Sequence, residues 1–83
     1  MREDLPISEK ILQMLHNLCA TAPDLARKSE ELAQVLQLEI SEVEKILDVY
    51  GFEGYVESFA DNQGKKWYYL TGRGIIKVCA LFT

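Results

Sequence analysis

The chain has 83 residues, of which 48% are hydrophobic and 27% are charged, and its formal net charge is −4. This length allows one domain, residues 1–83, which buries only about 60–65% of the surface that the unfolded chain exposes, so we expect a helix-rich fold or a dimer. The composition excludes a disordered chain, and the longest uncharged apolar stretch, residues 78–83, is far too short to span a membrane. Two cysteines and an acidic beginning argue against a secreted disulfide scaffold and favour the cytoplasm.

The net charge hides a gradient along the sequence. Residues 1–28 are neutral, residues 29–58 carry eight acidic side chains and only Lys45 as a base, and residues 59–83 carry a net charge of +3. An acidic protein is repelled by bare DNA, so the total charge alone argues against a nucleic-acid partner. Any function must therefore be compatible with an acidic middle and a basic end.

The first periodic segment runs from Ser8 to about Cys19. Its apolar side chains fall at helical spacing on one face, at Ile11, Leu12, Leu15, Leu18 and Cys19. Ser8 is expected as the N-cap, and Pro23 ends the segment because the residue before a proline avoids the helical region.

Two more helices are expected in the middle of the chain. The second begins at Ser29, a good N-cap residue, and ends near Gln37. The third runs from about Ile40 to Phe52, because apolar residues recur at i, i+3, i+4 and i+7, namely at Val43, Ile46, Leu47 and Tyr50. Gly54 follows as the residue that ends this helix in a left-handed conformation.

A β-hairpin and a short helix complete the prediction. Residues 55–60 and 65–70 are rich in aromatic and β-branched side chains, and Asp61-Asn62-Gln63-Gly64 between them predicts a four-residue loop. Neighbours in a strand alternate faces, so Tyr68 and Leu70 are expected on one face and Trp67 and Tyr69 on the other. A last helix, about 72–82, is expected to be capped by Thr71.

This order of elements resembles a winged helix-turn-helix domain. The apolar pattern of its helix-turn-helix is matched at Leu32-Ala33, Leu36-Gln37-Leu38, Val43, Leu47, Tyr50 and Gly54-Tyr55-Val56. The Tyr-x-Leu-Thr-x-x-Gly that closes the wing of MarR-type regulators is matched by residues 68–74, whereas Gln37 stands where a glycine is usual. The resemblance implies an α+β fold with a three-helix core, a two-stranded wing and a short C-terminal helix, in which residues 29–53 form the helix-turn-helix and 55–70 the wing.

The resemblance also implies a small DNA-binding transcriptional regulator. The third helix would enter the major groove, with Ser41, Glu42 and Lys45 at its outward positions, while Lys65, Lys66 and Arg73 would hold phosphates. DNA readers usually carry Arg, Ser, Thr, Gln or Asn on this helix, but here its outward face is acidic, so the wing must supply much of the attraction. The alternative is a protein-interaction module whose acidic third helix docks a partner and which binds no DNA.

Similarity to small MarR- and ArsR-like regulators suggests a homodimer through the terminal helices. The apolar last helix would otherwise expose hydrophobic surface. The expected contact residues are Leu15 and Leu18 in the first helix and Leu81 and Phe82 at the end of the chain. The alternative is that the last helix only completes the core of the monomer.

We expect no enzyme activity, metal or cofactor. His16 and Cys19 lie one helical turn apart and Cys79 is in the last helix, but a fourth metal ligand is missing and Cys19 continues the apolar face. The single histidine has no nucleophile beside it, and the sequence has no glycine-rich phosphate loop.

Overall fold

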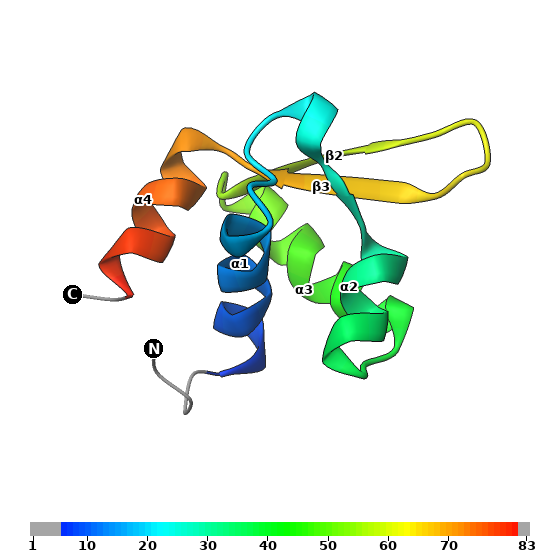
Figure 1. Cartoon of the computed structure of the whole chain (residues 1–83), viewed down its shortest axis with the longest axis horizontal. Helices are drawn as coiled ribbons and strands as arrows, with labels where there is room; N and C mark the ends of the chain where they lie inside the picture. The colour runs from blue at the N-terminus through cyan, green and yellow to red at the C-terminus, as the bar shows by residue number, and fades with distance from the viewer. Residues whose placement is uncertain (1–5, 82–83) are drawn as a thin grey trace.

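A computed structural model describes residues 6–81 as four α-helices and a three-stranded antiparallel sheet (Figure 1). In chain order the elements are α1 (Ile7–Asn17), the 3-10 turn η1 (Pro23–Leu25), β1 (Arg27–Lys28), α2 (Ser29–Leu36), α3 (Ile40–Phe52), β2 (Val56–Ala60), β3 (Lys66–Leu70) and α4 (Gly72–Ala80). The α+β winged helix-turn-helix fold expected from the sequence is confirmed. Strand β1 and turn η1 were not expected.

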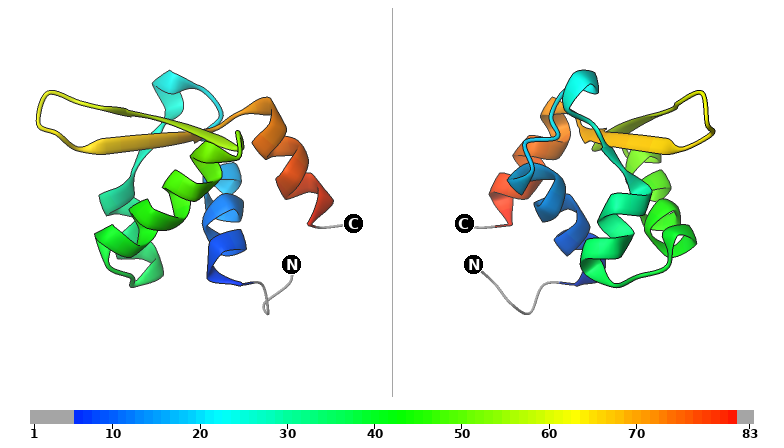
Figure 2. Two further views of the ribbon diagram at one scale, coloured as in Figure 1. Left: turned by 180° about the vertical axis from the view of Figure 1, so that it is seen from behind. Right: turned by 45° about the vertical axis from the view of Figure 1, so that its right-hand side comes forward.

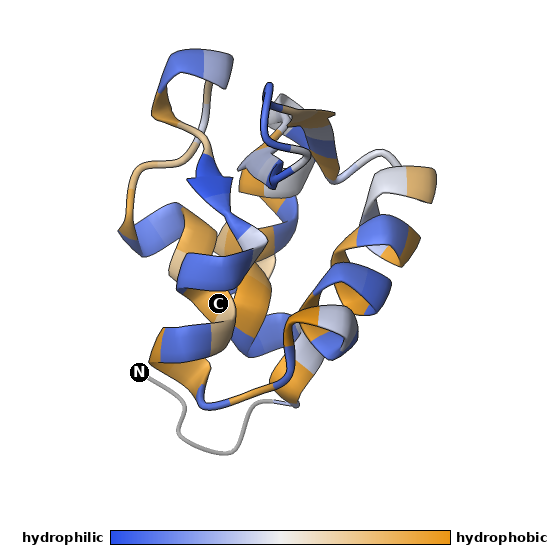
Figure 3. Cartoon of the chain, turned by 90° about the vertical axis from the view of Figure 1, so that its right-hand side faces the viewer, coloured by the Kyte–Doolittle hydropathy of each residue, from blue (hydrophilic) through white to orange (hydrophobic). Residues whose placement is uncertain are grey.

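The hydrophobic core lies between the helices and the inner face of the sheet. Its fully buried side chains come from every α-helix and from the last strand: Ile11, Leu12, Leu15, Leu32, Val43, Leu47, Tyr68, Leu70 and Val78. Each contributes about 1.5–3 kcal/mol relative to an exposed side chain. The alternation of hydrophilic and hydrophobic residues around the helices is visible in Figure 3. As expected for the last strand, Tyr68 and Leu70 are buried, while Trp67 and Tyr69 remain partly exposed.

The strand order of the sheet is β1-β3-β2, and the β2–β3 hairpin projects beyond the helices as the wing (Figure 2). Its register pairs Val56 with Leu70 at the base and Ala60 with Lys66 near the tip. The connecting loop, residues 61–65, has one residue more than expected. Asp61 closes this loop because its Oδ1 accepts hydrogen bonds from the backbone N–H groups of Gln63 (2.8 Å) and Lys65 (3.0 Å).

Two of the three expected helix caps are wrong. Helix α1 begins at Ile7, and Ser8 lies inside its first turn without capping it. Ser29 is likewise the first residue of α2, and its hydroxyl donates to Oε2 of Glu44 at 2.6 Å instead of accepting from its own helix. A long-range acceptor therefore displaced the local cap.

Thr71 caps α4 as expected and ties it to the end of α3. Its Oγ1 accepts from the N–H of Gly74 at 3.0 Å and donates to the carbonyl of Gly54 at 2.7 Å. Gly54 has the expected left-handed conformation, with φ +88°. A Cβ at Gly74 would collide with the carbonyl oxygen of Tyr55, so only glycine allows this close approach of α4 to the base of the wing.

The expectation that Cys19 continues the apolar face of the first helix is wrong. Helix α1 ends at Asn17, and Cys19 is exposed with a left-handed φ of 59°. This reversal brings Ala20 into the core, where its carbonyl accepts from the N–H of Leu70 at 2.7 Å. Two local hydrogen bonds close this turn, from the N–H of Cys19 to the carbonyl of His16 (3.0 Å) and from the N–H of Ala20 to the carbonyl of Leu15 (2.9 Å).

Gln37 occupies the helix-turn-helix turn in a conformation that favours glycine. Its φ is 58°, and the next residue, Leu38, donates its N–H to the carbonyl of Ala33 at 2.9 Å. A side chain in the left-handed region costs roughly 1–2 kcal/mol. The turn keeps its geometry because the buried residues on both sides of it fix the two helices.

We expect Gln37→Gly to raise the free energy of unfolding by about 0.5–1 kcal/mol, because glycine removes this conformational cost but adds chain entropy to the unfolded state. Chemical denaturation monitored by circular dichroism measures the change. Gln34→Gly, at an exposed position inside α2, is the matched control and should lower stability by about 1 kcal/mol. If both variants lowered the free energy of unfolding by the same amount, the prediction would be wrong.

Candidate nucleic-acid interface

The outward face of α3 carries the residues expected to read DNA. Ser41, Glu42 and Lys45 are all exposed, because Val43, Leu47 and Tyr50 turn the opposite side of the helix into the core. Asp48 is also exposed, and Glu44 is half-buried against Ser29. The acidic character of this helix is therefore at the surface.

The wing lysines contact carboxylates of the helix-turn-helix. Lys65 Nζ lies 2.6 Å from Oε2 of Glu30 on α2. Lys66 Nζ lies 2.9 Å from Oδ1 and 3.2 Å from Oδ2 of Asp48 on α3. The side chains in these pairs are 34–52% exposed, so solvent screens both pairs and each contributes little to stability.

Tyr68 completes the contact between the wing and α3. Its hydroxyl donates to Oδ1 of Asp48 at 2.9 Å, and its ring, fully buried, lies 5.4 Å from the Lys66 ammonium. Burial raises the pKa of Tyr68 to about 12, although Lys66 opposes this shift. The pKa of Lys66 is raised, mainly by its interaction with Tyr68 and to a smaller extent by its interaction with Asp48. The charged form of Lys66 and the neutral form of Tyr68 are therefore both favoured.

The Lys65–Glu30 pair shows the same electrostatic effect in both partners. The hydrogen bond between them lowers the pKa of Glu30 and raises the pKa of Lys65. Lys28, on the neighbouring strand β1, lies 5.4 Å from the Trp67 ring, whose Nε1 donates to Oδ2 of Asp61 at 2.9 Å. Cations and carboxylates thus alternate where the wing meets the helix-turn-helix.

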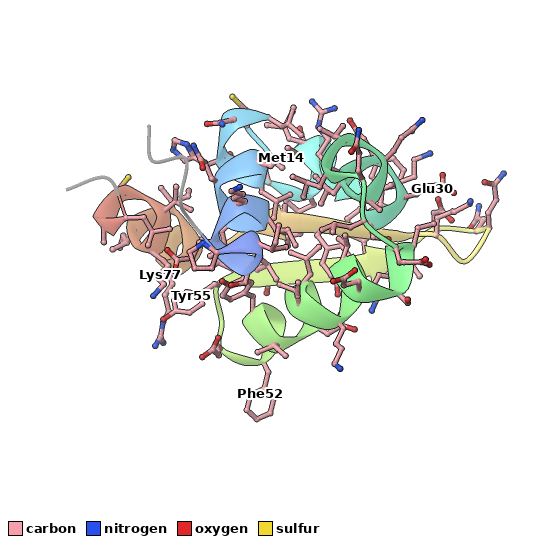
Figure 4. All side chains as sticks on the ribbon, turned by 90° about the horizontal axis from the view of Figure 1, so that it is seen from below. Met14, Glu30, Phe52, Tyr55 and Lys77 are labelled. Atoms are coloured by element: carbon pink, nitrogen blue, oxygen red, sulfur yellow. The ribbon has the colours of Figure 1, made fainter. Side chains whose placement is uncertain are left out.

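Arg73 lies apart from the two wing lysines. Its guanidinium is 5.5 Å from the ring of Tyr55, which also has Lys77 at 5.6 Å. Tyr55 precedes β2 at the base of the wing, whereas Lys65 and Lys66 lie near its tip. Figure 4 shows Tyr55 and Lys77 on the opposite side of the molecule from Glu30. The structure therefore brings Lys65 and Lys66 to the α3 face and leaves Arg73 at the other end of the wing.

Sequence reasoning missed an apolar part of the α3 surface. Phe52 is 94% exposed and Val49 is 57% exposed, and Phe52 points away from the body of the molecule in Figure 4. Beside them is a groove of about 300 Å³ between the start of α1 and α3, lined by Ser8, Lys45, Ile46, Val49 and Tyr50. The i, i+3 spacing of Val49 and Phe52 on the side of Lys45 was the available signal.

Of the residues expected to make a dimer contact, Leu15 is fully buried within the protomer. Leu18 and Leu81 are partly buried, and Phe82 lies outside the described residues. Helix α4 instead exposes Ile76, at 71%, and Cys79. The surface available for a second subunit at this end is therefore the outward side of α4 together with Leu18 and Leu81.

Within residues 6–81, no three side chains of the His, Cys, Asp and Glu types lie close enough together to hold a metal ion. His16, Cys19 and Cys79 do not form such a group. In the same part of the chain, no helix combines the length and the apolar character that crossing a membrane requires.

No family model matches the sequence, and no curated protein is significantly similar to it. Solved structures do resemble it. TubR from Bacillus megaterium pBM400 superposes with a TM-score of 0.76 at 22% identity, over 90% of this chain and 83% of that one. The DNA-binding TubR fragment from Clostridium botulinum superposes with a TM-score of 0.76 at 22% identity, over 96% of this chain and 99% of that one. A mutant MarR from E. coli complexed with operator DNA superposes with a TM-score of 0.69 at 22% identity, over 90% of this chain and 51% of that one.

These similarities show the fold. They confirm a winged helix-turn-helix domain resembling MarR, as the sequence predicts. The chain spans about half the length of MarR but nearly the whole TubR fragment. The chain therefore has the architecture of a single winged helix-turn-helix domain.

The pKa of Tyr68 predicts a loss of stability at high pH. The unfolded chain ionises this tyrosine near pH 10, whereas the folded chain keeps it neutral to about pH 12, so the folded state binds more protons in that interval. Near neutral pH, Tyr68→Phe should cost about 1 kcal/mol through the lost hydrogen bond. Between pH 10 and 12 the wild type should lose about 1–2 kcal/mol relative to the variant, so this difference should close and then reverse, as urea denaturation can measure. A gap that does not change with pH would contradict this assignment.

Proposed function

We propose that this chain is a small winged-helix DNA-binding protein that acts as a transcriptional regulator in the cytoplasm. The observation that carries the proposal is the contact between Lys66 and Asp48, because it sets the basic wing against the outward face of α3. A duplex that contacts this face also meets the wing lysines. The shared fold supports the proposal, since MarR is complexed with operator DNA and the TubR fragment is DNA-binding.

In this complex α3 lies along the major groove. Ser41 and Lys45 make its favourable contacts, and Glu42 can accept a hydrogen bond from N4 of cytosine. Lys65 and Lys66 hold phosphates beside the groove. Arg73 reaches a separate phosphate, because it lies at the base of the wing. The wing therefore supplies most of the electrostatic attraction, and α3 supplies the selectivity.

Fluorescence anisotropy with a labelled mixed-sequence duplex tests this function. The affinity of the wild type should fall steeply between 50 and 200 mM salt, because each phosphate contact adds roughly 0.9 to the slope of log K against log salt. Lys65→Glu combined with Lys66→Glu should abolish binding. Lys10→Glu, a charge reversal on α1, is the control and should retain it. Absence of wild-type binding at low salt would refute the function.

A second candidate function is protein interaction through α3. The exposed Phe52 and Val49 favour it, because a major groove offers few partners for a phenyl ring, whereas aromatic side chains commonly anchor protein interfaces. In this case the acidic residues of α3 would flank an apolar contact with a partner. The duplex titration separates the two functions, since this candidate requires no DNA affinity.

We further propose a homodimer through α4 and the end of α1. Sedimentation should give a dimer at micromolar concentration, and Ile76→Glu should convert it to a monomer, because a buried unpaired carboxylate is costly. Val35→Glu introduces the same charge at an exposed position on α2 and should leave the dimer intact. A monomeric wild type would contradict the dimer.

A further inference from the structure

The two lysines expected to hold DNA phosphates already have carboxylate partners. Glu30 contacts Lys65 and Asp48 contacts Lys66, and both carboxylates belong to the helix-turn-helix. Each pair joins residues far apart in the sequence, at separations of 35 and 18. Free phosphate-binding lysines on a wing would instead extend into solvent.

These lysines border a small cleft between the wing and the first turns of α2 and α3. Its volume is about 180 Å³, and it is lined by Lys28, Ser29, Glu30, Ile40, Glu44, Gly64, Lys65 and Lys66. Figure 4 shows Glu30 extending toward the wing. Three lysines and two glutamates line this cleft. The Glu30 carboxylate contacts Lys65, and the Glu44 carboxylate accepts from the Ser29 hydroxyl.

We propose that this junction is a phosphate-binding site that the chain's own carboxylates occupy in the free protein. Backbone phosphates of a duplex replace Glu30 on Lys65 and Asp48 on Lys66. The inference rests on the proposed DNA-binding function and adds a mechanism that lowers the affinity of the protein for DNA. Glu30 and Asp48 are then internal competitors of DNA.

The partial exposure of both pairs makes this exchange feasible. Side chains that are 34–52% exposed form weak ion pairs, so a phosphate can displace the carboxylates at little cost. The competitor must nevertheless be displaced on every DNA sequence. Binding to every duplex is therefore weakened by the same factor, whatever its sequence. The carboxylates thus lower the affinity for DNA without touching a base.

The test compares neutralising substitutions in the full chain by anisotropy on the mixed-sequence duplex. Glu30→Gln and Asp48→Asn should each bind about threefold to fivefold more tightly than the wild type. The side-chain amide that Asp48→Asn introduces can still accept from the Tyr68 hydroxyl, so the wing should keep its position. Glu31→Gln is the matched control: it removes the same charge one residue away, but Glu31 pairs with Arg27 and not with the wing.

A double-mutant cycle isolates the specific contact. If Glu30 competes for Lys65, the gain in DNA affinity from Glu30→Gln should disappear when Lys65 is replaced by glutamine. In that Lys65→Gln background, Glu30→Gln and Glu31→Gln should change the affinity by the same amount. Circular dichroism and thermal unfolding verify that each variant is folded.

Each result decides between the two proposals. One outcome is that the wild type binds DNA while Glu30→Gln and Asp48→Asn raise the affinity no more than Glu31→Gln does. That result overturns the internal competition and leaves the DNA function standing. Wild-type binding that Glu30→Gln or Asp48→Asn strengthens, and that Glu31→Gln does not, supports the competition. Absence of binding in every variant overturns both.

Discussion

The position of the wing depends on Tyr68. Its ring is fully buried in the core, and its hydroxyl reaches Asp48 on the outer side of α3. A single side chain thus links the second wing strand, the core and the helix expected to meet DNA. Because Tyr68 and Lys66 share the Asp48 carboxylate, the packing of β3 also fixes where the wing cation lies. Hydrophobic burial supplies most of the energy of this arrangement, and the polar contacts determine its register.

Local patterns predicted the helices, the hairpin and the alternation of faces in β3, because the spacing of apolar residues records which side is buried. They failed where a distant residue decided the local conformation. Ser29 bonds to Glu44 on α3 rather than capping its own helix. The left-handed turn at Cys19 was missed for a local reason, because no glycine marks it in the sequence. The candidate site was predicted as a set of residues but not as pairs. No local pattern places Glu30 beside Lys65, since their contact exists only after the wing packs against α2.

The charge gradient along the sequence acquires a spatial meaning from these pairs. The acidic middle and the basic end are brought together, so part of the charge is neutralised at the contact between the wing and the helix-turn-helix. Lys45 has no carboxylate partner among the described residues, and Arg73 and Lys77 face only the Tyr55 ring there. Net charge is therefore a poor guide to the partner, because it counts charges that already satisfy one another.

The bonds of Thr71 and the close approach of Gly74 to Tyr55 join α4 to the end of α3 without a flexible linker. In a two-fold dimer built on α4, this rigid joint would transmit the geometry of the subunit contact directly to both α3 helices. The distance between them would then select operators whose two inverted half-sites have a fixed separation along the duplex, one helical turn or a multiple of it. The cap of α4 would thereby fix the separation of the two half-sites, although none of its atoms contacts DNA.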